Sequence, residues 1–181
     1  MFAPIDWSRF PQELPVTFVV TIICVGLWAA ANLGLVTPQV TLPRDLSLST
    51  WVSHFFHLSL LHLVSNLLIV LFMGVLLERP LGWWRYAVLL GLVWNLTVLG
   101  LYWYIPDPAL GFSGIGLGLM VLAFFYWQDD KPTAQMLGVL LLLNLVFGLM
   151  PGVSWHGHVV GALSGLVVYG LIRAAQMGQK R

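Results

Sequence analysis

A serine and two histidines lie at nearly the same distance from the charged ends of three otherwise apolar stretches. Ser113 and His62 lie 16 residues before the charged residue that ends their stretch, and His158 lies 15 residues before its own. At the α-helical rise of about 1.5 Å per residue, these side chains would lie roughly 22–24 Å from one end of their helices. A hydroxyl and an imidazole at one depth could serve as a nucleophile and its base. Polar groups inside a membrane are costly and usually functional, so this pattern predicts intramembrane chemistry.

Ser113 is expected at or next to the start of its helix, between Gly111 and Gly114. Unsatisfied backbone N–H groups and the helix dipole favour developing negative charge at such a position, so the serine could act as a nucleophile. The plain alternative is that Ser113 only caps the helix. That alternative does not explain the histidines.

Small residues accompany the histidine and the serine on their helices. His158 shares one helix face with Gly161 and Gly165, and Gly114 and Gly118 form an i, i+4 pair after the serine. Such surfaces let transmembrane helices pack closely, which could bring a serine within about 2.6–3.2 Å of an imidazole. The alternative is an ordinary glycine-lined helix crossing.

We expect a catalytic dyad of Ser113 and His158, with a neutral His158 taking the serine proton. Asp107, on the loop before Ser113, is the only acidic residue that could reach the same plane. His62 and Asn66, at i, i+4 on the second predicted helix, could join the Ser113 N–H in stabilising an oxyanion. Alternatively, His62 and Asn66 only form hydrogen bonds between helices.

The remaining histidines are His54, His57 and His156, and we expect them to be exposed or interfacial in the external connections. The five histidines together could in principle bind a metal or haem. No cysteine or carboxylate accompanies them and no metal-ligand spacing appears, so we expect no metal and no other cofactor.

The composition places these groups in a membrane protein. Of 181 residues, 59% are hydrophobic and 8% are charged, against roughly 25% charged in soluble domains. The eight Lys and Arg residues are spread along the chain and the net charge is +1, so nothing favours a nucleic-acid partner. Cys24 is the only cysteine, which excludes an intrachain disulfide.

Apolar runs of about 20 residues predict an all-α bundle of six transmembrane helices. Their expected ranges are 15–35, 59–78, 83–104, 113–128, 134–150 and 156–173, within a single domain that covers residues 1–181. Seven of the eight basic residues fall on the side of the two termini, and only Arg44 falls on the other. The positive-inside rule therefore predicts cytoplasmic termini and an external 36–58 connection.

The fourth stretch is the shortest, with 16 residues or roughly 24 Å against a hydrocarbon thickness of about 30 Å. Residues 107–111 should therefore dip below the outer surface. Irregular backbone at that depth needs surrounding protein or water, which predicts a buried aqueous pocket.

These residues resemble the motifs of the rhomboid intramembrane serine proteases. The serine motif matches Gly111-Phe112-Ser113-Gly114, the His-x-x-x-Asn motif matches His62 to Asn66, and the final-helix His-x-x-Gly-x-x-x-Gly motif matches His158 to Gly165. The resemblance covers nearly the whole chain and is to the minimal six-helix bacterial type. Order and spacing of three motifs make it specific, whereas Gly-x-Ser-Gly alone is weak.

The resemblance implies that Ser113 is the nucleophile and His158 the general base, with His62, Asn66 and the Ser113 backbone in the oxyanion hole. His57 would help to hold the external loop. It further implies transmembrane protein substrates that enter between the second and fifth spans, in contact with membrane lipid, and a bacterial inner-membrane location. Two departures are Leu117, where many members carry tyrosine, and Trp51-Val52, where a Trp-Arg pair is common.

Other functions remain open at this point. A rhombosortase-like enzyme would process short C-terminal anchors, and a non-catalytic relative would bind transmembrane clients. A channel or transporter would be favoured by internal repeats, and none is found. The physiological substrate and the oligomeric state are not predicted.

Overall fold

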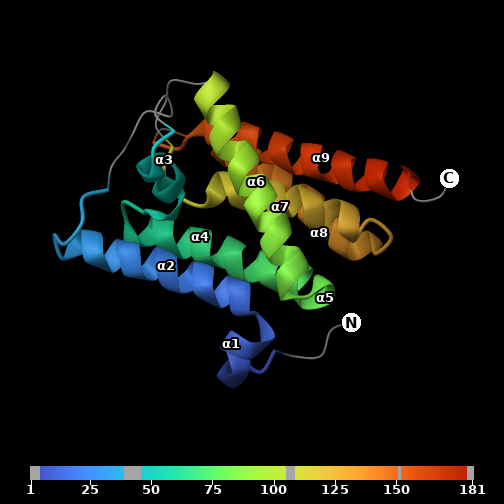
Figure 1. The fold of residues 1–181 in the computed structure, drawn as a ribbon, viewed down its shortest axis with the longest axis horizontal. Helices are drawn as coiled ribbons and strands as arrows, with labels where there is room; N and C mark the ends of the chain where they lie inside the picture. The colour runs from blue at the N-terminus through green and yellow to red at the C-terminus, as the bar shows by residue number, and fades with distance from the viewer. Residues whose placement is uncertain (1–4, 39–45, 105–108, 151, 179–181) are drawn as a thin grey trace.

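Helices run through nearly all of the chain that the computed structural model describes, which is residues 5–38, 46–104, 109–150 and 152–178 (Figure 1). The long helices are α2 (Pro15–Asn32), α4 (Leu60–Met73), α6 (Trp83–Tyr104), α7 (Ser113–Tyr126), α8 (Lys131–Phe147) and α9 (Trp155–Gly178). The short ones are η1 (Trp7–Arg9), α1 (Phe10–Glu13), α3 (Leu48–Val52), η2 (Ser53–Phe55), the π-helical turn η3 (Gly74–Glu78) and α5 (Arg79–Leu81). These described ranges contain no strand, so the predicted all-α class is confirmed.

Four of the described helical segments are long and apolar enough to cross a membrane. They are Pro15–Asn32, Leu60–Leu81, Trp83–Trp103 and Trp155–Gly178. Helices α7 and α8 are also apolar, but they have only 14 and 17 residues. The number of crossings, expected to be six, stays a prediction.

Helix α7 lies at the centre of the bundle. Every residue from Gly114 to Ala123 is buried, and the helix contacts α4, α6, α8 and α9. A helix that is apolar on all sides can lie in a protein core or against lipid, and Gly114, Gly116 and Gly118 let the neighbouring helices pack closely around α7. In Figure 1, α6 runs obliquely across the bundle while α2 and α4 lie side by side.

Glycines bring the backbones of α7 and α9 into direct contact. A Cβ atom on Gly161 would collide with the Gly114 carbonyl, and one on Gly165 would collide with the Gly118 carbonyl. In the other direction, a Cβ on Gly114 would lie 2.7 Å from the Gly157 oxygen. The predicted close packing between the two glycine-bearing faces is therefore present.

The second predicted helix, 59–78, corresponds to α4 followed by the π-helical turn η3, and α5 continues it to Leu81. Pro80 has no N–H, so the carbonyl four residues earlier, that of Leu76, lacks its usual helical donor. The indole N–H of Trp127 donates to the Leu76 oxygen instead, at 2.9 Å. A side chain that follows α7 thus stabilises the distortion in this helix.

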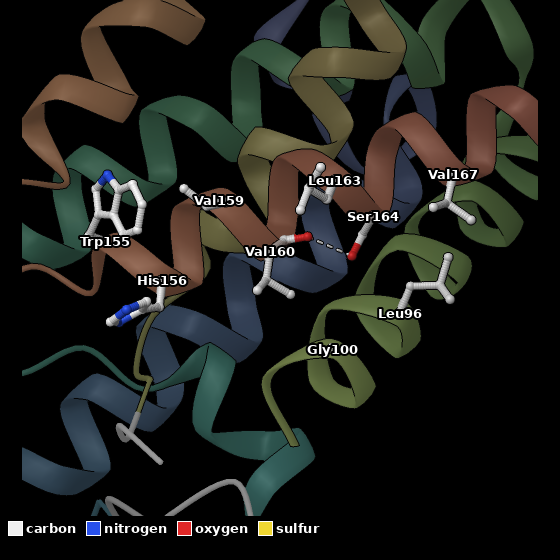
Figure 2. A pocket seen from close by; sticks show the side chains of 9 residues that line it. All are labelled: Leu96, Gly100, Trp155, His156, Val159, Val160, Leu163, Ser164 and Val167. Atoms are coloured by element: carbon white, nitrogen blue, oxygen red, sulfur yellow. Dashed lines mark hydrogen bonds between the residues drawn. The ribbon is translucent and has the colours of Figure 1, made fainter. Parts of the chain in front are cut away.

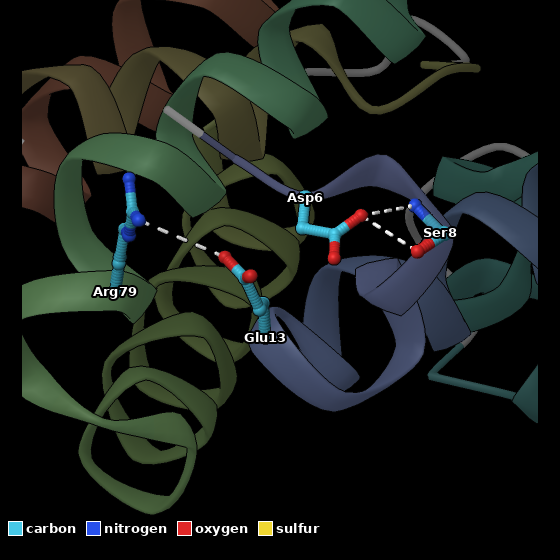
Figure 3. Close-up of polar contacts among 4 residues, drawn as sticks. All are labelled: Asp6, Ser8, Glu13 and Arg79. Carbon is cyan, nitrogen blue, oxygen red and sulfur yellow. Dashed lines mark hydrogen bonds and ion pairs between the residues drawn. The ribbon is translucent and has the colours of Figure 1, made fainter. Parts of the chain in front are cut away.

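Two acidic side chains fix the N-terminal segment to this same region. The buried carboxylate of Glu78 accepts hydrogen bonds from the Val16 N–H at 2.7 Å, the Thr17 N–H at 2.9 Å and the Thr17 hydroxyl at 2.6 Å. It thereby satisfies free N–H groups in the first turn of α2. Glu13 pairs with Arg79 at 3.7 Å, as Figure 3 shows.

Figure 3 also shows how the chain begins before α2. Asp6 accepts hydrogen bonds from the Ser8 N–H at 3.0 Å and from the Ser8 hydroxyl at 2.6 Å, which caps the short η1 helix. The described N-terminal segment is therefore folded against the end of α5, at the end of the bundle opposite Ser113.

The connection between α2 and α4 was expected to be a long loop, and its described part instead contains α3 and η2. Trp94 of α6 anchors it, since its indole N–H donates to the Trp51 carbonyl at 3.2 Å and its ring meets Phe55 edge-on at 5.0 Å. These contacts come from a distant helix, and for that reason local sequence did not reveal them.

Several helix boundaries differ from the expected ranges: α2 ends at Asn32 rather than near 35, α7 at Tyr126 rather than near 128, and α8 at Phe147 rather than near 150. Helix α8 begins at Lys131 rather than near 134, because Pro132 is well suited to the first turn of a helix and does not end one there. Helix α9 continues to Gly178, beyond the charged Arg173 at which the apolar run ends. None of these differences moves a candidate site residue.

Candidate active site

The hydroxyl of Ser113 and the imidazole of His158 are in contact. Ser113 Oγ lies 3.0 Å from His158 Nε2, although 45 residues separate them in the chain. His158 is 5% exposed, and Ser113 is partly exposed. The glycine contacts between α7 and α9 make this approach possible.

Ser113 does not cap its helix. It is the first residue of α7, the N-cap position belongs to Phe112, and no side chain caps the helix there. The hydroxyl faces the histidine instead. The arrangement does not support the alternative in which Ser113 serves only as a cap.

The other ring nitrogen of His158 has a partner that the sequence did not indicate. Nδ1 lies 3.0 Å from the main-chain carbonyl of Asn144, near the C-terminal end of α8. A carbonyl only accepts, so Nδ1 carries the hydrogen, and in the neutral ring Nε2 is then free to accept from the Ser113 hydroxyl. Any residue type could supply such a carbonyl, which leaves no signal in the sequence.

Gly111 holds the turn that delivers the chain to the serine. Its φ of +92° lies in the left-handed region, and its N–H donates to the Ser53 carbonyl at 3.3 Å. A Cβ at this position would lie 2.5 Å from His62 Nε2. Glycine is therefore required twice, by the backbone conformation and by the histidine ring beside it.

His62 lies beside the turn at Gly111 that precedes the serine, and Asn66 lies one turn further along α4. The His62 ring packs against Gly111, while the Asn66 amide donates to the His62 carbonyl at 2.8 Å. Asn66 is 3% exposed, and no hydrogen-bond partner of its Oδ1 is found among the described residues. One N–H of Asn66 is thus used by its own helix.

His57 was expected to be exposed or interfacial, and that expectation is wrong, because His57 is 2% exposed and packs against His62. Its Nδ1 is 3.1 Å from the Phe55 carbonyl, and its ring meets that of His62 edge-on at 4.9 Å. Burial, together with the smaller effect of the neighbouring His62, lowers the pKa of His57 to about 4. The ring therefore links the connection before α4 to His62.

His54 was expected to be exposed or interfacial, and that expectation is wrong. The side chain is 3% exposed and forms a hydrogen bond with the main chain of Gly111. Burial lowers the pKa of His54 to about 4, although the bond to Gly111 opposes this shift. The short helix η2 turns the ring inward, which a reading of the segment as a loop could not predict.

His156 is only two residues from His158 but belongs to a separate surface feature. It lines a groove between α6 and α9, with a volume of about 600 Å³ (Figure 2). The groove is mostly apolar and includes Gly100 and Leu163, and its one buried hydroxyl, that of Ser164, donates to the Val160 carbonyl at 2.8 Å. Ser113 and His158 are not among its lining residues.

Two further expectations concern neighbours of the serine. Leu117 is fully buried in α7, one turn after Ser113, at the position where many members of the family that the motifs resemble carry tyrosine. Asp107 lies outside the described residues. Within the described parts of the chain, no three His, Cys, Asp or Glu side chains gather in a way that could hold a metal ion.

Comparisons with known proteins give matches to one family. The family model described as Rhomboid domain matches residues 46–175. The chain is 30% identical over 123 residues to Rhomboid-type serine protease 2 of Emericella nidulans, a match that covers 63% of this chain and 24% of that protein. It is 30% identical over 125 residues to Rhomboid-related protein 4 of Homo sapiens, covering 59% of this chain and 40% of the relative.

A plant protein gives a similar result. RHOMBOID-like protein 4 of Arabidopsis thaliana is 27% identical over 124 residues, which cover 62% of this chain and 30% of that protein. The matched segment is therefore less than half of each of these relatives.

Proposed function

The chain belongs to the rhomboid family and is an integral membrane protein, and we propose that it is a serine endopeptidase that cleaves transmembrane proteins within the membrane. The observation that carries this proposal is the 3.0 Å contact between Ser113 Oγ and His158 Nε2. The bond from Nδ1 to the Asn144 carbonyl supports it, because it leaves Nε2 able to accept a proton.

The proposed reaction follows from these two side chains. Ser113 Oγ attacks the carbonyl carbon of the scissile peptide while its proton moves to His158 Nε2. The carbon–nitrogen bond then breaks, and the departing amine takes that proton, which leaves an acyl-enzyme on Ser113. A water molecule gives its proton to Nε2 and attacks the ester, and the returning proton regenerates the serine as the new carboxyl group leaves.

The negatively charged oxygen of the tetrahedral intermediate needs hydrogen-bond donors that stabilise it. The Ser113 N–H is available because it lies in the first turn of α7, where no helical carbonyl precedes it. We assign His62 and Asn66 as the side-chain donors, since the His62 ring lies beside the turn at Gly111 and Asn66 follows one turn later on the same helix. Removing one such donor typically lowers kcat by about 100- to 1,000-fold.

The membrane arrangement belongs to the same proposal. We place both termini in the cytoplasm and Ser113 nearer the outer face, with six crossings in total and an inner-membrane location in a bacterium. Substrates enter laterally between α4 and α8. A substrate helix that unwinds readily near the cleavage site is preferred, because an extended backbone is needed at the serine.

The decisive experiment measures cleavage of a single-span model substrate by the purified protein in liposomes. Ser113→Ala and His158→Ala should each reduce cleavage by at least about 1,000-fold, and fluorophosphonate labelling should be lost in Ser113→Ala. Ser164→Ala is the matched control, because its hydroxyl only bonds the Val160 carbonyl on the same helix. Equal labelling or cleavage in the Ser113→Ala protein would refute the proposal.

Leu117 keeps one narrower alternative open. A rhombosortase-like enzyme would process short C-terminal anchors with the same two catalytic residues. Comparing cleavage of a single-span substrate with that of a Gly-Gly-tailed anchor separates the two substrate classes. A non-catalytic client-binding protein would cleave neither.

A further inference from the structure

The carbonyl of Asn144 accepts two hydrogen bonds at the C-terminal end of α8. The Gly148 N–H donates to it at 3.0 Å as part of the last helical turn, and His158 Nδ1–H donates to it at 3.0 Å from α9. A carbonyl oxygen has two lone pairs, so both bonds can form together. The imidazole is thus oriented by the main chain of a different helix.

That end of α8 is only partly covered by the rest of the protein, since beyond Leu140 and Leu141, which pack against the core, most of its large side chains are exposed. The buried residues of α8 are Ala134 and Leu137, both in its N-terminal half. In the C-terminal half, Leu142 is 63% exposed, Val146 54% and Phe147 56%. Segments with few buried contacts are the ones that move at low cost in free energy.

Gly148 lets this helix end lie against the imidazole. A Cβ at Gly148 would lie 3.1 Å from His158 Nδ1 and 3.2 Å from Trp155 Cδ1. Both distances are tighter than most real Cβ contacts, so a methyl group here has to push the ring or the helix end aside. By contrast, a Cβ at Gly138 of the same helix would meet only Phe124, at an ordinary 3.5 Å.

We propose that the Asn144 main-chain carbonyl is the positioning group for His158, so that the location of the C-terminal end of α8 controls whether the Ser113–His158 pair can react. This rests on the proposed function. With the carbonyl in place, the ring keeps its hydrogen on Nδ1 and presents a bare Nε2 to the serine. When the helix end moves away, Nδ1–H loses its acceptor, and the ring can turn or adopt the tautomer whose Nε2 cannot take the serine proton.

The first test weakens the carbonyl without changing any side chain. Replacing Leu145 by its α-hydroxy analogue converts the Asn144–Leu145 amide to an ester, whose carbonyl is a poorer acceptor. The matched control places the same analogue at Leu143, which also removes one helical N–H but leaves the Asn144 amide intact. We expect the Leu145 ester to lower kcat about 3- to 10-fold relative to the control with KM unchanged. Equal kcat values for the two esters would overturn the proposal.

The second test reads the ring itself and does not depend on catalysis. In ¹⁵N-histidine NMR spectra of the protein in micelles, His158 should be the Nδ1–H tautomer. Gly148→Ala should add the Nε2–H tautomer or exchange between the two forms, whereas Gly138→Ala should not. An unchanged His158 signal in Gly148→Ala, or an Nε2–H tautomer in the wild-type protein, contradicts the positioning role even if Ser113→Ala has already established proteolysis. Conversely, these spectra can support the positioning role in a protein that proves to have no protease activity.

Discussion

At the scale of single residues, the site is a short series of hydrogen bonds in which each group has one role. The Ser113 hydroxyl donates to His158 Nε2, and Nδ1–H donates to a main-chain carbonyl. A buried carboxylate would have to be desolvated in this position, and a carbonyl carries no net charge, so it avoids that cost. Among the described residues no acidic side chain is seen to bond to His158, and the carbonyl explains how the histidine is oriented without one.

The first prediction concerns Gly111. Gly111→Ala should lower activity by at least about tenfold and should also lower the thermal unfolding midpoint, because the backbone is strained at φ +92° and the methyl group collides with His62. Gly34→Ala is the control. Its φ is +71° but no atom lies within 4 Å of the added Cβ, so it should lose stability and keep its activity. Similar losses of activity in Gly111→Ala and Gly34→Ala would show that backbone strain, and not the contact with His62, causes the loss.

The second prediction is a dependence of stability on pH. Burial lowers the pKa of His54 to about 4, while an unfolded histidine has a pKa of about 6.5. Between these values the unfolded chain binds a proton that the folded protein does not, so stability falls as the pH drops from about 6.5 towards 4. The loss amounts to up to about 3 kcal/mol for such a histidine.

His57, whose pKa is also about 4, adds to the same trend. Thermal unfolding in detergent micelles at pH values from 7 to 4.5 measures the effect. His54→Gln removes one titrating ring, and its midpoint should therefore fall less steeply with pH than that of the wild-type protein. Parallel curves for the two proteins would contradict the assigned burial of His54.

At the scale of helices, the spacing between α7 and α9 determines whether a serine side chain can reach an imidazole. A serine has only one carbon between its hydroxyl and the backbone, so the helix axes have to approach until the backbones touch. Gly114, Gly118, Gly161 and Gly165 provide that approach. Close packing of small residues is also a main source of helix association in lipid, so the same contacts stabilise the bundle.

The third prediction compares two glycines of α9, one packed against α7 and one without close neighbours. Gly161→Ala should force the helices apart, lower activity by at least about tenfold and destabilise the fold by about 1–3 kcal/mol, because its methyl group meets the Gly114 carbonyl. Gly170→Ala has no neighbour within 4 Å and should be neutral or slightly stabilising. Cleavage assays and unfolding midpoints measured together test this. Full activity in Gly161→Ala would mean that the contact is not needed for the approach of the serine.

At the scale of the whole molecule, the described helices surround one buried short helix, and charge is concentrated at one end. Arg79 and Glu13 pair near α5, while Glu78 binds the first turn of α2. Ser113 and His158 lie toward the opposite end. This asymmetry is the basis for placing the termini in the cytoplasm.

The fourth prediction tests that placement. After Cys24, the only native cysteine, is replaced by alanine, new cysteines are introduced at Gln12 or at Leu35, which are both exposed. A membrane-impermeant maleimide should label the Leu35 variant in intact spheroplasts, and it should label the Gln12 variant only after the cells are opened. The reverse pattern would invert the proposed topology.

The sequence by itself determined the helical class, the membrane environment and the candidate catalytic side chains. Apolar runs in lipid have to form helices, because backbone polar groups find no water there. Ser113, His158, His62 and Asn66 stand out since polar residues are rare in such runs. These signals are local, and one residue or one run of residues carries each of them.

The tertiary structure alone decided how these groups are oriented. Every residue type has a main-chain carbonyl, so the role of the Asn144 carbonyl leaves no signal in the sequence. The burial of His54 depends on the contact of its segment with Gly111. The π-helical turn before Pro80 is likewise supported by Trp127, 51 residues after Leu76. Contacts between distant segments depend on which surfaces pack together, and a pattern along one segment does not encode that choice.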